Sequence, residues 1–273
     1  MRRATLRRVL GSAFAALLLA VGGCGGGGGA STDTAAGASG QVSTFTLKSA
    51  ENGYVYTLQT FVPASYATGT ATLPTIYVTE GDAPYGGIKS RFEVFKEVMQ
   101  RRGTQAILVG ISGTERRVVD FLLPGAQSYV NFIAKELAPS IERQYRADPA
   151  RRALSGLSHG GYLVVAALVL EGSAGNLSFS HYLSTDSSFG GHGDVAGFLN
   201  YEKQLDAAGK PLPATLFLAG SRNANGPVVV APLYAQMASH NHAGLTLLTA
   251  QYDTTHVGSD LPAFEEALTR FFP

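Results

Sequence analysis

The sequence predicts an α/β fold, in which helices cover both faces of a mostly parallel β-sheet. Short apolar runs rich in β-branched residues alternate along the chain with segments whose apolar residues recur every three or four positions. Such alternation is typical of strand–helix–strand units, whose strands pair in parallel. The chain has 273 residues, and no break in composition interrupts residues 41–273. We therefore expect this segment to form one domain.

Two strands should precede the alternating region as an antiparallel pair. Val42–Leu47 and Tyr54–Val62 have period-two character and no helical pattern lies between them. The later strands are short and apolar, as strands buried on both faces are. They are expected at Thr75–Thr79, Ala106–Ile111, Arg152–Leu157, Ser180–Ser184, Ala214–Leu218 and Leu245–Ala250.

Helices are expected between these strands and after the last one. Apolar residues at helical spacing predict helices over residues 88–99, 130–141 and 261–271. Pro139 should kink the second of them, because proline has no N–H for the helical hydrogen bond. The segment Tyr162–Leu170 is apolar on every side, which predicts a helix buried at the centre of the fold.

The first 23 residues have the pattern of a secretory signal peptide. Four arginines precede an apolar run, Ala13–Val21, and small residues follow it. The run is shorter than the roughly 20 apolar residues of a membrane-spanning helix. We therefore expect residues 1–23 to be removed during export.

Residues 21–24, Val-Gly-Gly-Cys, resemble the lipobox of bacterial lipoproteins. In that family cleavage precedes the cysteine, whose sulfur carries a diacylglycerol. Cys24 is the only cysteine, and residues 25–40 are so rich in Gly, Ala, Ser and Thr that they should act as a flexible linker. The resemblance implies an exported protein anchored to a membrane through lipidated Cys24, facing the periplasm or the cell surface. A plain signal peptide with an incidental cysteine is the alternative.

Composition excludes several other classes of function. Without the four arginines of the signal peptide, 17 basic residues face 20 acidic ones, so the net charge of the remaining chain is −3. A weakly acidic protein without a basic stretch is poorly suited to bind nucleic acid. A single cysteine also excludes a disulfide framework and a site of several thiolates. We expect neither a metal nor a cofactor in the active site.

A candidate nucleophile lies between one predicted strand and the buried helix. Gly156-Leu157-Ser158-His159-Gly160 has the form Gly-x-Ser-x-Gly, which between a strand and a helix is called a nucleophile elbow. The flanking glycines allow strand and helix to approach each other closely. Ser158 would then stand exposed at the N-terminus of the helix, where the helix dipole favours negative charge.

Several short motifs surround this elbow: Ile76–Asp82, Phe132-Ile133, Glu136–Pro139, Ile141-Glu142, Tyr145-Arg146 and Arg152–Gly161. Together they resemble the putative-esterase family of α/β-hydrolases, over about residues 54–272. That family includes siderophore, feruloyl and acetyl-xylan esterases. The resemblance implies an α/β-hydrolase fold and a serine esterase without a cofactor, whose small-molecule substrate is a siderophore or a carbohydrate-linked ester.

His256 is the candidate general base, because it lies between the last strand and the last helix, where the hydrolase fold supplies its histidine. The usual position of the acid, after Ala214–Leu218, holds no carboxylate. A non-catalytic binding lipoprotein on the same scaffold is therefore the competing hypothesis. For a catalytic protein we favour Asp186 as the acid. A Ser–His dyad is a further possibility, and the remaining candidates for the orienting group are Asn223, Asn225 and Asp253.

The remaining candidate site residues follow strands at the same edge of the sheet. The backbone N–H of His159 should donate to the oxyanion of the tetrahedral intermediate. By resemblance, the second N–H comes from Asp82, after Thr75–Thr79. Arg116 and Arg117 could bind a substrate carboxylate or catecholate, and the alternative for either is an ion pair on a solvated loop.

The other histidines have no assigned catalytic role. His181 and His192 flank a predicted strand and are candidates for the wall of the cleft. His240 and His242 have the pattern of a solvated helix end. A His–His metal pair is the alternative there, but the sequence indicates no third ligand.

Overall fold

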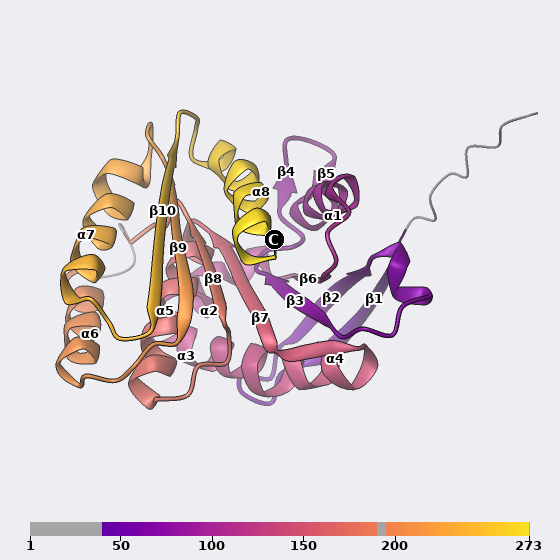
Figure 1. Ribbon diagram of the computed structural model, residues 1–273, viewed down its shortest axis with the longest axis horizontal. Coiled ribbons are helices and arrows are strands. Elements are labelled where there is room, and N and C mark those ends of the chain that lie inside the picture. Colours follow the sequence, from indigo (N-terminus) through magenta and orange to yellow (C-terminus); the bar gives the residue numbers. More distant parts are fainter. Residues whose placement is uncertain (1–39, 190–194, 273) are drawn as a thin grey trace, which may run out of the picture. The chain divides into compact units, whose positions relative to one another are not determined.

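The computed structural model describes residues 40–189 and 195–272, and these lie in one compact unit. Among them, eight strands form one sheet in the order β1-β2-β6-β3-β7-β8-β9-β10 (Figure 1). The strands are β1 (Gln41–Lys48), β2 (Val55–Val62), β3 (Leu73–Val78), β6 (Ile107–Ile111), β7 (Ala147–Leu157), β8 (His181–Thr185), β9 (Ala214–Ser221) and β10 (Leu245–Tyr252).

The pairing of these strands confirms the predicted mostly parallel sheet. β1 pairs antiparallel with β2, and β2 pairs antiparallel with β6. Every later neighbour in the sheet is parallel. A separate short hairpin, β4 (Pro84–Tyr85) and β5 (Lys89–Ser90), follows β3 in the chain.

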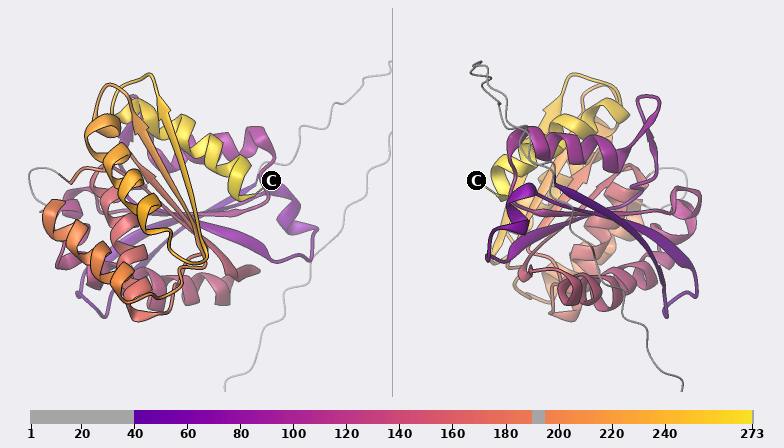
Figure 2. Two further views of the ribbon diagram at one scale, coloured as in Figure 1. Left: turned by 60° about the vertical axis from the view of Figure 1, so that its left-hand side comes forward. Right: turned by 90° about the vertical axis from the view of Figure 1, so that its right-hand side faces the viewer.

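Helices cover both faces of the sheet, as predicted (Figure 2). α1 and α8 pack on one face, where the rings of Phe95 and Phe264 stack with their centroids 3.8 Å apart. α5 and its neighbours pack on the other face, and α5 is buried along nearly its whole length. The helices are α1 (Arg91–Arg102), α2 (Arg117–Asp120), α3 (Gly125–Asn131), α4 (Ala138–Gln144), α5 (His159–Ala174), α6 (Val195–Ala207), α7 (Ala231–His240) and α8 (Asp260–Phe271).

The first long helix begins later than its apolar spacing predicts. Ile88 is fully exposed between β4 and β5, and α1 begins at Arg91. Ser90 forms a capping box: its side chain accepts from the N–H of Glu93, whose carboxylate accepts from the N–H of Ser90. This local hydrogen bonding fixes the start of the helix, so the prediction that included Ile88 was wrong.

The predicted helix over residues 130–141 is divided by a wider turn. A π-helical turn, Phe132–Leu137, joins α3 to α4. Pro139 lies in the first turn of α4, where a missing N–H is tolerated. Val130, Ile133, Leu137 and Ile141 are all buried, so the predicted apolar face is confirmed.

The parallel strands bring their carboxyl ends to one edge of the sheet, and the segments that follow them meet there. In open α/β sheets, ligands bind beyond this edge. The expected signal peptide, Cys24 and nearly all of the linker lie outside the described residues. Within the described part of the chain, no helix has the length and apolar character needed to cross a membrane.

Candidate active site

Ser158 occupies a sharp turn between β7 and α5. Its backbone has φ 60° and ψ −117°, a conformation that non-glycine residues rarely adopt. Hydrogen bonds hold the turn on both sides: the N–H of Ser158 donates to the carbonyl of Thr185 at 3.0 Å, and its carbonyl accepts from the N–H groups of Tyr162 and Ser188, each at 3.0 Å. The backbone around the hydroxyl is therefore fixed by α5 and by the segment after β8.

The glycines around Ser158 are required by close backbone contacts. A Cβ atom on Gly156 would lie 2.2 Å from the carbonyl oxygen of Gly160. A Cβ atom on Gly160 would lie 2.5 Å from Oγ1 of Thr79, at the end of β3. Strand β7 and helix α5 thus approach each other as closely as the Gly-x-Ser-x-Gly pattern predicts.

His256 and Asp186 are hydrogen-bonded beside this turn. His256 follows β10 and Asp186 follows β8, and Nδ1 of the imidazole lies 2.5 Å from Oδ2 of the carboxylate. The Asp186 side chain is fully buried and also accepts from the N–H of Ser221 at 2.8 Å. Because Nδ1 faces the carboxylate, Nε2 is the ring nitrogen that can accept a proton from a nucleophile.

The other candidates for the orienting group bind elsewhere. The side-chain amide of Asn223 donates to Oδ1 of Asp253 at 3.0 Å. The side-chain amide of Asn225 donates to the carbonyl of Asp186 at 3.0 Å. Among the four candidates, Asp186 is thus the group that the structure places on His256, and Asn225 supports Asp186.

Ser188 is a site residue that sequence reasoning missed. Its Oγ lies 3.0 Å from Oγ of Ser158, and it accepts from the side-chain amide of Asn225 at 3.0 Å. Proton transfer to His256 requires the Ser158 hydroxyl to turn from Ser188 toward Nε2. Since Ser188 follows β8 at the carboxyl edge of the sheet, its position after a buried strand is the signal that could have found it.

Ser158 and His256 line the same cavity, whose volume is about 290 Å³. A larger cavity, of about 550 Å³, lies at the other end of β3, among residues that include none of the candidate catalytic groups. We regard the smaller cavity as the candidate active site because it contains the reactive side chains. Its other lining residues are Glu80, Ala83, Pro84, Tyr85, Arg91, Thr114, Arg117, Leu157 and Val257.

Glu80 places a buried carboxyl group in the wall of this cavity. Burial raises the pKa of Glu80 to about 7, although the guanidinium groups of Arg91 and Arg117 lower it. Nη1 of Arg117 lies 3.7 Å from Oε1 of Glu80, and the Arg117 side chain is 47% exposed. Glu80 lies two residues after the end of β3, so its position beyond the carboxyl end of a buried strand is the signal that could have found it.

Arg116 and Arg117 have different environments. Nε and Nη2 of Arg116 each donate to the Asp120 carboxylate at 2.8 Å, and the guanidinium lies 4.3 Å from the centre of the Tyr54 ring. These contacts hold the Arg116 side chain beside α2. Arg116 does not line the cavity, so its predicted role in substrate binding does not fit. Arg117 does line the cavity.

Asp82 lies in the turn after β3, as predicted. Its carboxylate accepts from Oγ1 of Thr114 at 2.8 Å and from the N–H of Gly113 at 3.2 Å. The side chain therefore holds the neighbouring loop, and the role of its N–H at an oxyanion stays a prediction. His159 is the first residue of α5.

His181 is remote from the cavity. It begins β8, at the opposite edge of the sheet, where its ring lies 4.7 Å from that of Phe271. The expectation that it lines the cleft was therefore wrong, because the residue starts the strand rather than ending it. His192 lies outside the described residues.

Solved structures with this fold include several hydrolases. An IroE-like serine hydrolase from Shewanella oneidensis has a TM-score of 0.71 and 21% identity, with 84% of this chain and 79% of the other covered. The siderophore hydrolase EstA from Aspergillus nidulans has a TM-score of 0.69 and 18% identity, with 84% and 93% covered. An enterobactin and salmochelin hydrolase, IroE, has a TM-score of 0.63 and 17% identity, with 85% and 95% covered.

At these identities the likeness establishes the α/β-hydrolase fold. No curated protein sequence matched the chain. The family described as "Putative esterase" matches residues 49–204, which is more than half of the chain and contains the Ser158 turn and Asp186. The chain therefore belongs to the putative-esterase family.

Proposed function

We propose that this protein is a serine esterase that hydrolyses carboxylic esters through an acyl-enzyme. The observation that carries the proposal is that one cavity is lined both by Ser158, on its strained turn, and by His256, whose imidazole is hydrogen-bonded to buried Asp186. A hydroxyl, a base and a group that orients the base are the parts that nucleophilic ester hydrolysis needs.

In the first half-reaction, the hydroxyl oxygen of Ser158 attacks the ester carbonyl while Nε2 of His256 takes the hydroxyl proton. The N–H groups of His159 and Asp82 donate to the resulting oxyanion. His256 then returns the proton to the departing alcohol, and the acyl group stays on Ser158. Water attacks this ester while the same imidazole takes its proton. The imidazolium then returns that proton to Oγ of Ser158 as the acid leaves, which restores the free serine.

The wall of the cavity supports an ester with an acidic or catechol group as the substrate. Arg117 offers an exposed guanidinium, which suits planar anions. Glu80 is half ionised near neutral pH, because burial raises its pKa to about 7. Structures of similar fold include siderophore hydrolases and a ferulic acid esterase.

We also propose that the protein acts outside the cytoplasm, anchored through Cys24. The apolar run followed by Val21-Gly22-Gly23-Cys24 supports this placement. Residues 25–40 would separate the catalytic domain from the membrane surface, since chains rich in glycine are flexible.

The first prediction concerns the nucleophile. Ser158→Ala should abolish labelling by a fluorophosphonate probe and lower the turnover of p-nitrophenyl butyrate by on the order of 10³-fold or more. The matched control is Ser140→Ala, on α4 outside the cavity, which should label normally. Labelling of Ser158→Ala would exclude Ser158, and a folded wild-type protein that does not react would favour the non-catalytic binding hypothesis.

A second prediction tests the orienting group. Asp186→Asn should lower kcat by on the order of 10³-fold, because an amide donating to Nδ1 would place the ring proton on Nε2, where a base is needed. Asp253→Asn, the matched carboxylate that contacts Asn223 instead, should change kcat by less than about twofold. Steady-state kinetics of both variants test whether Asp186 orients His256. Equal kcat values for Asp186→Asn and Asp253→Asn would remove Asp186 from the mechanism.

The pKa of Glu80 leads to a third prediction. As the pH rises from 6 to 8, Glu80 loses its proton and repels anionic substrates. The ratio of kcat/KM for p-nitrophenyl hemiglutarate to that for neutral p-nitrophenyl butyrate should then fall by about fivefold or more, since like charges about 4 Å apart repel by about 1 kcal/mol even in a medium as polar as water. A pH effect on the chemical step itself is common to both substrates and cancels in the ratio.

In Glu80→Gln this ratio should be independent of pH between 6 and 8. Glu115→Gln is the matched control, because Glu115 bonds the Tyr54 hydroxyl outside the cavity, and it should retain the wild-type pH dependence. A ratio that falls equally in Glu80→Gln would assign the effect to another group.

A fourth prediction concerns the anchor. Full-length protein expressed in a bacterium that processes lipoproteins should sediment with membranes and incorporate labelled palmitate. Cys24→Ala should lose the label and appear in the soluble exported fraction, because no thiol remains to carry the lipid. Continued membrane association of Cys24→Ala would contradict anchoring through this residue, whereas esterase activity should be the same in both proteins.

A further inference from the structure

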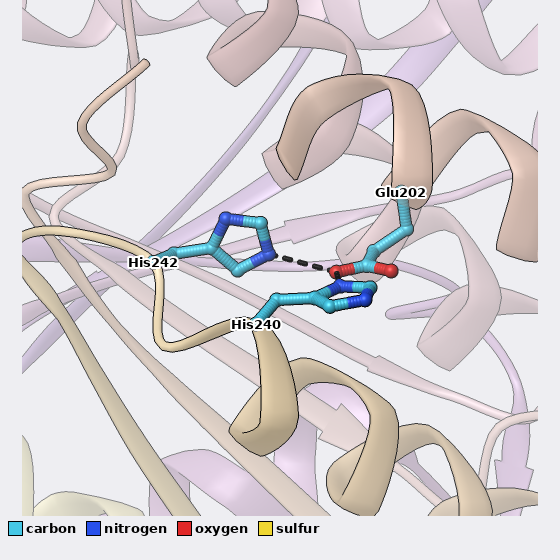
Figure 3. A group of neighbouring side chains, drawn as sticks. All are labelled: Glu202, His240 and His242. Carbon is cyan, nitrogen blue, oxygen red and sulfur yellow. Dashed lines mark hydrogen bonds and ion pairs between the residues drawn. The ribbon is translucent and has the colours of Figure 1, made fainter. Parts of the chain in front are cut away.

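Two histidines and a glutamate from separate elements lie together near the amino end of β10, away from the candidate active site. Glu202 belongs to α6, His240 ends α7, and His242 lies in the loop before β10. Nδ1 of His240 and Nε2 of His242 each lie 2.7 Å from the same oxygen, Oε1 of Glu202 (Figure 3). One potential ligand atom from each residue lies within 4.8 Å of the others.

The buried position of Glu202 calls for a positively charged partner. Its side chain is fully buried, and that of His242 is 2% exposed. Its second oxygen, Oε2, accepts from the side-chain amide of Gln236 at 2.5 Å, which orients the carboxylate but adds no charge. A buried carboxylate is costly unless a positive partner compensates it. That charge comes either from a protonated His240, whose pKa the hydrogen bond with Glu202 raises, or from a bound metal ion.

We propose that Glu202, His240 and His242 bind one Zn²⁺ ion. Two imidazole nitrogens and one carboxylate oxygen form a donor set that zinc accepts in tetrahedral coordination. The His240 side chain is 21% exposed, so water can reach the fourth position and the ion has a route from solvent. Gln236 would hold the carboxylate from the outer shell.

Binding requires only small rearrangements of these side chains. Each of the two nitrogens, now 2.7 Å from Oε1, would move away from that oxygen by about half an ångström around an ion bound at roughly 2.0–2.1 Å. Each neutral ring moves its proton to its other nitrogen: His240 binds through Nδ1 and keeps the proton on Nε2, and His242 does the reverse.

The location indicates a structural ion rather than a catalytic one. His242 precedes β10, whereas His256 follows it, so the cluster lies at the amino end of this strand and the candidate active site at its carboxyl end. An ion here would join α6 to the end of α7 and to the loop before β10. It would stabilise the fold without touching the ester-binding cavity.

The test uses tag-free protein treated with a chelator and then titrated with ZnSO₄. We expect one zinc per chain by elemental analysis after gel filtration, and a Tm that rises by about 4–8 °C at saturating zinc. Co²⁺ in place of zinc should give the visible absorption of a tetrahedral site. Zinc that neither binds stoichiometrically nor raises the Tm would overturn the proposal and leave a hydrogen-bonded His–Glu–His cluster.

Variants locate the site. Glu202→Gln and the more exposed His240→Asn should both lose the bound zinc and the rise in Tm, and His240→Asn keeps the test valid where the buried substitution prevents folding. His181→Asn, which removes a histidine on another strand, should retain both. Retention of one zinc by His240→Asn would overturn the assignment. Fluorophosphonate labelling should be the same in all three variants, so this result is independent of the proposed esterase activity.

Discussion

The close approach of β7 and α5 around Ser158 is the constraint on which the arrangement of this site depends. A Cβ atom on Gly156, Gly160 or Gly161 would collide with the backbone or with Thr79 at the end of β3. The segment after β8 closes the same turn, since Ser158 exchanges hydrogen bonds with Thr185 and Ser188. Three neighbouring strands therefore hold one strained residue, and the cost of its backbone conformation is offset by packing around it.

A buried ion pair joins the segment that carries His256 to the end of β3. Nε and Nη2 of Arg91 donate to the Asp260 carboxylate at 2.7 Å, and Nη1 donates to the carbonyl of Thr79 at 2.7 Å. Burial lowers the pKa of Arg91, but Asp260 more than compensates and raises it above its usual value. Since Asp260 begins α8 just after His256, the pair joins the end of β3 to the loop of the base. Loss of either partner would leave a buried charge, at a cost of about 3–5 kcal/mol.

Sequence reasoning reached the fold and the serine because both depend on short-range patterns. Strand and helix periodicity, and five residues around Ser158, are local signals. The partner of His256 was open among several groups, because Asp186 is 70 positions away and the contact arises only when β8 and β10 end at the same edge. Glu80 was missed as a titrating group for a related reason: its pKa depends on burial and on Arg91 and Arg117, which no local pattern reveals. His242 was expected in solvent and is buried.

The two clusters of titratable groups lie at opposite ends of β10, and their electrostatics differ accordingly. At the carboxyl end, the Asp186 carboxylate is hydrogen-bonded to Nδ1 of His256, and His256 lines a cavity. Nε2 is then the nitrogen that would exchange a proton with a substrate in the proposed reaction. At the amino end, both imidazoles direct a nitrogen at one carboxylate oxygen, so the donors converge on a point rather than on a cavity. Nitrogen lone pairs that converge on one point suit the proposed cation, whereas a base with one free nitrogen suits the proposed proton transfer. Under the two proposals, the same residue types would support catalysis at one edge of the sheet and stability at the other.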